Sequence, residues 1–410
     1  MITLYSEDKD CCGCGGCASV CPKNAILMKK NQDGFLFPEI NQEKCIECGL
    51  CKKSCGYQEE YNWYTPIECY AAVNKDQELL EKSTSGGIFS AIAEKFINSG
   101  NYVCGAAVDF ENSKATVKHI IINSKEKLYR LQKSKYVQSS TSEVYKEVRH
   151  LLKNGETVLF SGTPCQVAEM KKVAGKNIDN LYTMDIICHG VPSEEFFNEY
   201  LKCEAKKKKI EINSFTFRNK KYGWGLDGNI LGITEQGKKI EMIINPESSS
   251  YYHYFLKGEI YRESCYVCPY ANNRRVGDLT IGDYWGIEKN NPELLSENGG
   301  LLDEKKGISC LMVNTKQGKD LIEKFGTKIE KYPVSYTDIS MVNTQLNHPA
   351  SHTELRSIIF ESYRGNGYDE IERIFKKYRS RQEKIKKIKR RVKKILPDKV
   401  VCVIKNKRKK

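Results

Sequence analysis

Residues 11–22 read CCGCGGCASVCP, and residues 45–55 read CIECGLCKKSC. Both stretches space four cysteines as Cys-x2-Cys-x2-Cys-x3-Cys, the spacing of bacterial ferredoxins. The first three cysteines of such a run wrap a loop around one [4Fe–4S] cube, and the fourth binds the other cube. Cys12 stands next to a predicted ligand and cannot point in the same direction, so we exclude it. The two runs therefore predict a ferredoxin-type module with two [4Fe–4S] clusters.

The predicted ligand sets cross between the two runs. The first cluster takes Cys11, Cys14, Cys17 and Cys55, and the second cluster takes Cys45, Cys48, Cys51 and Cys21. Tight loops around sulfur favour residues without a side chain, and the runs contain Gly13, Gly15, Gly16 and Gly49. Two zinc sites are the alternative, but zinc ligands normally come as separated pairs. Gly56 stands where proline often follows the second run, which alters the local turn and not the ligand count.

Composition points to a reducing compartment. The chain has 410 residues, enough for two or three domains, and 18 cysteines, eight of them ligands in the two runs. It shows no apolar signal peptide and no stretch of about 18 apolar residues that would span a membrane. We therefore expect a cytoplasmic protein with reduced, metal-binding cysteines. The cysteines without metal-type spacing are interpreted as structural: Cys69, Cys104, Cys203, Cys310 and Cys402.

The positive charge is confined to one end of the chain. The net charge is +14, but residues 376–410 carry eighteen Lys and Arg against two acids, which leaves residues 1–375 at −2. A body without surplus positive charge argues against a nucleic-acid groove, so no specific nucleic acid is expected as a partner.

The basic end has the pattern of an amphipathic helix. From Tyr378 onward apolar residues recur at helical spacing among Lys and Arg, and the pattern ends at Pro397. Such a helix binds an anionic membrane surface or an acidic protein, which would place the chain at the inner face of the membrane. The alternative is a solvated helix that packs on the body by its apolar stripe.

Hydrophobic periodicity predicts a mixed α/β body between these two ends. Apolar runs typical of buried strands lie at 102–108, 157–160 and 182–187. Helical patterns lie at 87–98, 142–153, 165–173 and 194–208, and a β-rich hairpin insertion is expected at 213–242. The predicted order is a bacterial-ferredoxin-like dicluster module at 1–58, a mixed α/β body at 66–350 and a basic tail at 369–410.

Four further cysteines stand where strands and turns of this body are expected to end. They are Cys165 in SGTPCQ, Cys188 in DIICHGVPS, and Cys265 with Cys268 in ESCYVCPY. Sites in open α/β sheets assemble at the carboxyl ends of strands, so the four thiols are candidates to hold a third [4Fe–4S] cluster or a zinc ion. Spacing alone points to metal only for Cys265 and Cys268. The other two are equally consistent with small buried core residues.

Several of these segments resemble the family of coenzyme F420 hydrogenase/dehydrogenase beta subunits. The resemblance is carried by TSGG (84–87), SKYVQS (134–139), SGTPCQ (161–166), CHGVPS (188–193), RESCYVCPY (262–270), Arg274, Arg275 and GDLTIGDYWG (277–286). With the ferredoxin-type module it extends over roughly residues 1–345. It implies an N-terminal family region at 66–150 and a C-terminal one at 151–350. It also implies FAD beside a [4Fe–4S] cluster held by Cys165, Cys188, Cys265 and Cys268.

The segment before the first body helix is a candidate phosphate site. Ser85, Gly86 and Gly87 precede the helix expected at 88–98, and hydroxyls and glycines there let a phosphate approach the helix N-terminus. An ordinary helix cap is the alternative, because the segment is not GxGxxG.

Five more residues are candidates at the flavin. Lys135 and Tyr136 would pair with a pyrophosphate or flank the flavin ring, or else are a surface lysine and a core tyrosine. Asp278 and Asp283 would hold ribose hydroxyls or only close a turn. His189 is a candidate catalytic residue that exchanges a proton with a flavin nitrogen. We favour a simpler role for it, a hydrogen bond to the cluster loop.

The sequence thus predicts an iron–sulfur flavoprotein oxidoreductase. FAD would exchange hydride with a carrier of the F420 or NAD(P)H type, and single electrons would pass through the clusters to or from a redox partner protein. The expected substrate class is a small metabolite or a precursor of cell-surface polysaccharide. The alternatives are a non-catalytic electron carrier or adaptor that docks a partner enzyme, and a cluster-bearing redox sensor whose tail binds membrane or nucleic acid.

Overall fold

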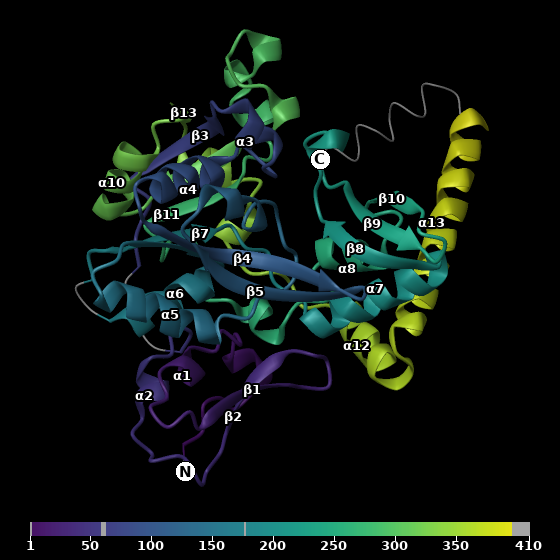
Figure 1. Ribbon diagram of the computed structural model, residues 1–410. Coiled ribbons are helices and arrows are strands. Elements are labelled where there is room, and N and C mark those ends of the chain that lie inside the picture. Colours follow the sequence, from purple (N-terminus) through teal and green to yellow (C-terminus); the bar gives the residue numbers. More distant parts are fainter. Residues whose placement is uncertain (1, 59–62, 176–177, 396–410) are drawn as a thin grey trace.

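The computed structural model describes residues 2–58, 63–175 and 178–395. Figure 1 shows the ferredoxin-type module at one end, a body built on one large sheet, and a smaller sheet with a long helix at its side. This arrangement confirms the predicted order of module, mixed α/β body and helical tail.

The module consists of a hairpin and two short helices. Its elements are α1 (Gly16–Ser19), β1 (Ile26–Lys30), β2 (Leu36–Ile40) and α2 (Leu50–Lys53), and β1 pairs antiparallel with β2. Each helix starts after a glycine in the left-handed region, Gly15 at φ 77° and Gly49 at φ 74°. Glycine adopts this conformation without strain, which explains both residues. Gly16 has a different reason, because a Cβ there would overlap the carboxyl group of Glu169.

One eight-stranded sheet forms the centre of the body, in the order β13-β3-β12-β11-β7-β6-β4-β5. Its strands are β3 (Glu68–Asn74), β4 (Tyr102–Glu111), β5 (Lys114–Ile122), β6 (Val158–Gly162), β7 (Leu181–Ile186), β11 (Leu279–Asp283), β12 (Ser309–Val313) and β13 (Ile329–Pro333). Strands β11, β7, β6 and β4 run parallel, and antiparallel pairs flank them on both sides. The three strands predicted from apolar runs are β4, β6 and β7, all in the parallel block.

Helices cover both faces of this sheet (Figure 1). They are α3 (Gln77–Glu81), α4 (Ile88–Asn98), α5 (Ser142–Lys153), α6 (Pro164–Ala174), α9 (Ile287–Asn290), α10 (Lys316–Phe325) and α11 (Tyr336–Ser340). Leu159 of β6 joins the core beneath α4 and α10, whereas Val158 and Phe160 join the core beneath α5 and α6. Strands buried on both faces read as continuous apolar runs, which made these strands predictable.

A three-stranded sheet and four helices form the adjoining part of the body. They are α7 (Glu194–Lys208), β8 (Ile210–Thr216), β9 (Gly228–Thr234), β10 (Lys239–Ile244), α8 (Ser250–Leu256), α12 (Glu354–Asn366) and α13 (Tyr368–Ile395). The hairpin predicted at 213–242 is wrong in strand number, because β8 pairs with β9 to make a three-stranded antiparallel sheet. Aromatic side chains fill its core, and Phe196, Phe197 and Tyr251 are fully buried.

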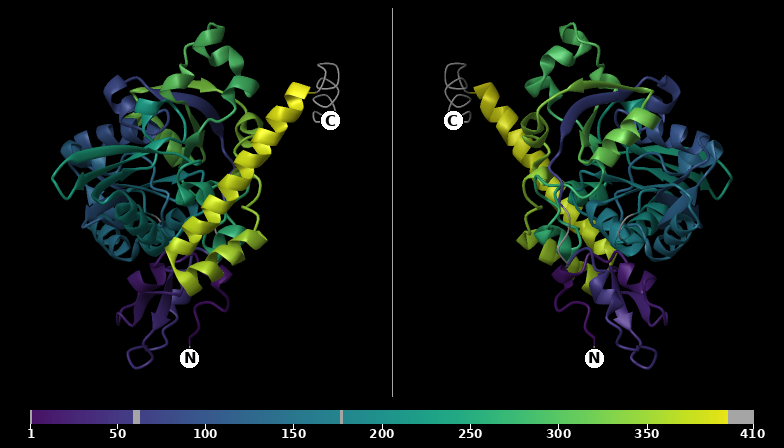
Figure 2. Two further views of the ribbon diagram at one scale, coloured as in Figure 1. Left: turned by 90° about the vertical axis from the view of Figure 1, so that its right-hand side faces the viewer. Right: turned by 90° about the vertical axis from the view of Figure 1, so that its left-hand side faces the viewer.

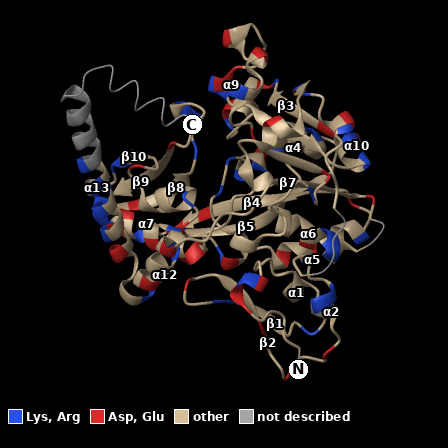
Figure 3. Ribbon diagram, turned by 180° about the vertical axis from the view of Figure 1, so that it is seen from behind, with Lys and Arg blue, Asp and Glu red and all other residues tan. Residues whose placement is uncertain are grey.

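Helix α13 continues beyond the body (Figure 2). Its first turns pack on α7 and α8 through the buried side chains of Ile371 and Phe375. Figure 3 marks Lys and Arg in blue along the described part of this helix. The predicted stop at Pro397 and the segment after it lie outside the described residues. Within the described ranges, no helix has both the length and the apolar composition needed to cross a membrane.

A buried ion pair joins the end of β7 to the segment that precedes β11. Nη2 of Arg275 lies 2.7 Å from Oδ1 of Asp185, and the two side chains are 2% and 0% exposed. Asp185 also accepts hydrogen bonds from the N–H of Gly277 at 2.8 Å and from the hydroxyl of Thr280 at 2.7 Å. One carboxylate thus ties the end of β7 to the segment that leads into β11.

Replacing Asp185 by asparagine should destabilise the fold, because Arg275 then stays buried without a counter-charge. We expect the free energy of unfolding to fall by about 3–5 kcal/mol in an anaerobic denaturant titration. Glu39→Gln is the matched control, since Glu39 pairs with Lys29 at the surface and its loss should cost less than about 1 kcal/mol. Equal effects of the two substitutions would contradict this role of Asp185.

Candidate functional site

Two neighbouring parallel strands place Cys165 and Cys188 at the same edge of the large sheet. β6 and β7 stay paired up to Gly162 and Asp185, after which each chain leaves the sheet. Thr163 caps α6, so Cys165 lies in the first turn of that helix. Cys188 follows the end of β7 by two residues. The register of the strands therefore brings two predicted ligands together.

Cys265 and Cys268 reach the same place from the short 3-10 helix Glu263–Val267. The thiol of Cys188 interacts with those of Cys265, Cys165 and Cys268. Burial, and then the charges of the other thiols, raise the pKa of both Cys265 and Cys268 to about 12. Such thiols ionise only beside a cation, and four converging cysteines are the donor set of an iron–sulfur cube. The structure thus brings the four predicted cysteines of the body together.

Other cysteines of the body lie apart from this site. Cys104 and Cys310 are fully buried on β4 and β12, and Cys203 lies on α7. Within the described ranges, no three His, Cys, Asp or Glu side chains approach closely enough to hold one metal ion. A cube separates its ligands more widely than a single ion does, so this finding concerns a zinc-type site and not a cluster.

Inside the module, the predicted crossed ligand sets surround two small cavities. The first cavity, of about 30 Å³, is lined by the first set, Cys11, Cys14, Cys17 and Cys55. The second cavity, of about 20 Å³, is lined by the second set, Cys21, Cys45, Cys48 and Cys51. Cys51 lines both cavities and so stands between the two sets. Cys48 is exposed, so the second set lies nearer to the surface of the module.

Arg262 is the central contact between the body and the module. Its side chain is 1% exposed, its Nε donates to the carbonyl oxygen of Cys11 at 2.8 Å, and its Nη2 donates to that of Leu36 at 2.9 Å. The guanidinium also lies 4.1 Å from the centre of the Phe37 ring, in a cation–π contact. Arg262 lies shortly before Cys265 in the sequence. The same loop of the body therefore binds the backbone of the first cysteine run and carries one of the body cysteines.

The second cysteine run docks on the body through Gly56. Its N–H donates to Oε2 of Glu169 at 2.7 Å, and its carbonyl oxygen accepts a hydrogen bond from the hydroxyl of Tyr270. Glu169 lies on α6 one turn after Cys165, and burial raises its pKa to about 7. A Cβ at position 56 would lie 2.9 Å from the backbone nitrogen of Glu169. Proline has a Cβ and no N–H, so the position requires glycine.

Cys12, excluded above as a ligand, lies at the same junction. It is 7% exposed and lines the first cavity. Its thiol interacts with those of Cys14 and Cys165, and Nε2 of Gln138 donates to its carbonyl oxygen at 2.8 Å. Local spacing gives no sign of this contact, because it joins positions far apart in the sequence.

A cavity of about 800 Å³ extends from Cys165 and Cys188 along the carboxyl edge of the large sheet. Its volume is within the range of small-molecule and cofactor sites. Its other end reaches the N-terminus of α4 at Gly87 and the side chains of Lys133 and Lys135. One space therefore joins the four-cysteine site to a cationic end.

Two lysines, Lys133 and Lys135, lie here, and neither forms an ion pair with a described acidic side chain. Nζ of Lys135 donates to the carbonyl oxygens of Gln132 at 2.6 Å and Arg130 at 3.1 Å, and burial lowers its pKa to about 7. An ammonium group has three N–H donors, so one remains for a ligand. Lys133 has φ of 66°, a conformation that costs energy in residues other than glycine. Cations and a helix N-terminus together suit phosphate oxygens.

Five of the seven residues predicted at the flavin line this cavity: Ser85, Gly87, Lys135, Tyr136 and Asp283. The structure corrects the other two. Asp278 is 2% exposed and accepts hydrogen bonds from the N–H of Thr183 at 2.8 Å and from Lys171 at 3.3 Å, so it ties the sheet to α6. Gly86 packs against the backbone of Ala72 and Ser309 with no room for a Cβ. Asp278 therefore connects the sheet to α6 and Gly86 packs against neighbouring backbone, and neither residue lines the cavity.

Asp283 lines the cavity, but its carboxylate is already paired. Oδ2 lies 2.5 Å from Nη1 of Arg218, and Oδ1 accepts a hydrogen bond from the indole N–H of Trp224 at 2.8 Å. The ring of Trp224 stacks on that of Trp285 with centroids 4.7 Å apart. Arg218 and Trp285 also line the cavity. Both were missed as site residues, and the only sequence signal was the place of Trp285 in a family-like segment.

Two histidines line the cavity. The expected hydrogen bond from His189 to the cluster loop is wrong, since its ring has no hydrogen-bond partner in the described part of the chain. Burial lowers its pKa, so the imidazole is neutral near pH 7. His119, which the sequence did not indicate, is held between Ser161 and Ser139 at 3.0 and 2.9 Å, and burial lowers its pKa to about 4.

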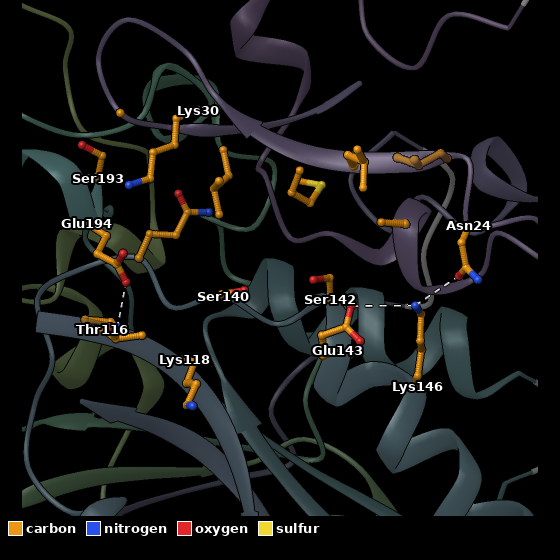
Figure 4. A pocket seen from close by; sticks show the side chains of 18 residues that line it. Asn24, Lys30, Thr116, Lys118, Ser140, Ser142, Glu143, Lys146, Ser193 and Glu194 are labelled. Carbon is orange, nitrogen blue, oxygen red and sulfur yellow. Dashed lines mark hydrogen bonds and ion pairs between the residues drawn. The ribbon is translucent and has the colours of Figure 1, made fainter. Parts of the chain in front are cut away.

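A second cavity, of about 710 Å³, lies between the module and the body (Figure 4). Lys30 of β1 and Lys118 of β5 lie on its opposite walls. Lys146 lies between Glu143 and Asn24 of the module, with its Nζ 3.8 Å from Oε1 of Glu143 and 3.5 Å from Oδ1 of Asn24. The described residues that line it include no cysteine. We therefore place the candidate cofactor site in the cavity at Cys165 and Cys188.

Family models match most of the chain. The model for the C terminus of the beta subunit of coenzyme F420 hydrogenase/dehydrogenase matches residues 155–335. The corresponding N-terminal model matches residues 69–146, and a 4Fe-4S dicluster domain model matches residues 10–58.

Individual proteins show more distant similarity. The F subunit of the F(420)H(2) dehydrogenase of Methanosarcina mazei is 22% identical over 213 residues, which are 48% of this chain and 59% of that protein. The iron-sulfur A subunit of the CoB–CoM heterodisulfide reductase of Methanocaldococcus jannaschii is 37% identical over 65 residues, 13% of this chain and 10% of that protein. The chain thus spans about three fifths of the first relative's length and about a tenth of the second's.

Among solved structures, a chain of the F420-reducing [NiFe] hydrogenase complex of Methanosarcina barkeri aligns with a TM-score of 0.43 at 16% identity, over 70% of this chain and 90% of that one. The N- and C-terminal family models together cover well over half of the present chain, and the dicluster model covers both cysteine runs. The chain therefore belongs to the family of coenzyme F420 hydrogenase/dehydrogenase beta subunits and carries a 4Fe–4S dicluster domain at residues 10–58.

Proposed function

We propose that this chain is an iron–sulfur flavoprotein that passes electrons between a hydride carrier and its clusters. The observation that supports this most is the cavity that contacts Cys165 and Cys188 at one end and Lys133, Lys135 and the α4 N-terminus at the other. Its volume and its donors fit FAD, with the phosphates at the cationic end. A bound FAD supplies the coupling of two-electron hydride transfer to one-electron transfer, which amino-acid side chains do not provide.

The residues of the chain would bind and orient this cofactor. The N–H groups at the start of α4 and the remaining N–H of Lys135 would bind phosphate oxygens. Trp285, held by its stack with Trp224, offers a flat aromatic wall. His189 is neutral and open to the cavity, so it is the candidate group to exchange a proton with the ligand.

The three four-cysteine sets would each hold one [4Fe–4S] cluster. We name these the first cluster, the second cluster and the body cluster, the last on Cys165, Cys188, Cys265 and Cys268. The family takes its name from F420, so a carrier of the F420 or NAD(P)H type is proposed on the hydride side. A relative named as part of a dehydrogenase supports a protein partner on the other side.

The main alternative is an electron carrier or adaptor without a substrate pocket. The cavity argues against this alternative, because an electron carrier needs neither a space of about 800 Å³ beside its cluster cysteines nor lysines that line it.

Cofactor content distinguishes the two functions. Protein purified without oxygen should contain about twelve iron per chain, for three cubes, and one extractable FAD. The variant Cys265→Ala/Cys268→Ala should retain about eight iron, because only the body cluster is lost. Iron and flavin are measured by colorimetric assay and by chromatography of the extract. About eight iron per chain without flavin in the unmodified protein would favour the electron carrier or adaptor. Zinc bound at the four body cysteines would contradict electron transfer between the flavin and the module clusters, because zinc has no redox chemistry.

Lys135 should control FAD affinity. Removing its ammonium group by Lys135→Met should weaken FAD binding to the flavin-depleted protein by about 1.5–3 kcal/mol, roughly tenfold to a hundredfold. Because its pKa is about 7, the lysine is charged in acid and mostly neutral in base. Affinity in the unmodified protein should therefore fall as pH rises from about 6 to about 8.5, and the variant should lose this dependence.

The matched control for Lys135 is Lys125→Met, since Lys125 pairs with Glu94 outside the cavity. An equal loss of affinity in both variants, measured by fluorescence titration, would show that Lys135 does not contact the cofactor.

The basic tail is proposed to bind an anionic membrane surface. Each Lys or Arg near such a surface contributes about 1 kcal/mol, and residues 376–410 hold eighteen. The full chain should sediment with phosphatidylserine vesicles at low salt and not with neutral vesicles. A chain ending at Ser380 keeps the buried Ile371 and Phe375 and should stay in solution. Equal sedimentation of both chains would assign membrane binding elsewhere, and sedimentation of neither would contradict it.

A further inference from the structure

Contacts at the junction between module and body order the three cysteine sets. Cys12 lines the first cavity together with Cys14 of the first set and Glu169, which lies one turn after Cys165 on α6, and its thiol interacts with that of Cys165 of the body set. Cys51 lines the cavities of both module sets and interacts with Cys48 and Cys21 of its own set. The body set therefore lies next to the first set, and the first set lies next to the second set. Cys12 lies between the body set and the first set, and Cys51 lies between the two module sets.

We propose that Cys12 is a positioning residue that couples the body cluster to the first cluster, so that the first cluster is the inner relay and the second cluster is the outer one. This inference rests on the proposed function, since it requires all three clusters. Each passage moves one electron: the donor cluster is oxidised by one, the acceptor cluster is reduced by one, and no bond or proton changes. When the carrier gives hydride to the flavin, the two electrons would leave one at a time through the clusters to a one-electron redox protein, and the proton would leave the flavin for solvent.

The surroundings of Cys12 hold its thiol in place. Its backbone oxygen is bound by Gln138, and the preceding carbonyl is bound by the buried Arg262. The hydroxyl of Tyr57, which also lines the first cavity, donates to the carbonyl oxygen of Ser264 at 3.0 Å. Electron transfer falls steeply with the separation of the centres, so a junction fixed by hydrogen bonds on both sides sets its rate.

The opposite end of the module is open. Cys48 is exposed, and its neighbours Ile46 and Leu50 are 57% and 46% exposed while lining the second cavity. Cys12, in contrast, is almost completely buried. The second set is thus the one that an external redox protein can approach, which agrees with its place as the outer cluster.

Removing one module cluster at a time tests the order. The full-length variants Cys11→Ala/Cys17→Ala and Cys45→Ala/Cys48→Ala should each hold about eight iron per chain against about twelve in the unmodified protein. Reduced clusters are paramagnetic, and neighbours broaden or split each other's EPR signals. After dithionite reduction, the body cluster should stay coupled to a neighbour when the second cluster is removed and lose this coupling when the first is removed.

The reverse pattern would overturn the order while leaving the proposed function intact. About eight iron in the unmodified protein would instead contradict the proposed function, and with it the inference.

The variant Cys12→Ala tests the coupling. Iron content and the EPR signals of all three clusters should be retained. When the reduced protein is mixed with cytochrome c, a one-electron acceptor too large to enter the cavity, the body cluster should reoxidise several-fold more slowly in stopped-flow absorbance. Cys203→Ala is the matched control, because Cys203 is also 7% exposed but lies on α7. Cys12→Ser, which keeps a polar side chain of similar size, replaces the alanine variant if that does not fold. A body-cluster phase as fast as in Cys203→Ala would overturn the role of Cys12.

Discussion

The hydrogen bonds of Arg262 hold the ferredoxin-type module on the body of this chain. A guanidinium that is 1% exposed needs permanent partners, because an unpaired buried charge costs several kcal/mol. Its partners are backbone carbonyls of the module, at Cys11 and Leu36, so the module cannot shift without breaking them. The same loop continues into Cys265. This segment, together with the contacts of Gly56 and Gln138, therefore fixes the separation between the module and body thiols.

The sequence predicted what local patterns encode. Cysteine spacing predicted two module sets, and the cysteines of each set line one small cavity. Continuous apolar runs predicted the parallel strands whose ends carry Cys165 and Cys188. It failed where a residue's role depends on distant contacts. We exclude Cys12 as a ligand because it is adjacent to a predicted ligand and cannot point in the same direction. This argument concerns neighbouring residues alone, so it does not reveal the contact of Cys12 with Cys165. Asp278 is predicted at the flavin because nothing in the sequence shows that Thr183 donates a hydrogen bond to its carboxylate.

The cavity illustrates the same limit. Arg218, from the segment between β8 and β9, forms part of its wall and pairs with Asp283 at the end of β11, and Trp224 of the same segment donates a hydrogen bond to that carboxylate. Arg218 of the adjoining part of the body thus neutralises Asp283, the carboxylate found among the described residues that line the cavity. Lys220 of the same segment donates to the carbonyl oxygens of Leu80 at 2.7 Å and Ser85 at 2.6 Å, which fixes the loop before α4. The cationic end of the cavity is therefore shaped from outside the large sheet.

Gly56 fits the ferredoxin-type module to the body of this chain. A free ferredoxin gains a rigid turn from proline after its last cysteine, but this chain uses the N–H and the empty side-chain space of glycine to receive Glu169. The module is thus no longer an interchangeable part. Grafting an unrelated ferredoxin with proline at this position onto this body would remove the hydrogen bond to Glu169 and place a Cβ against the backbone of α6.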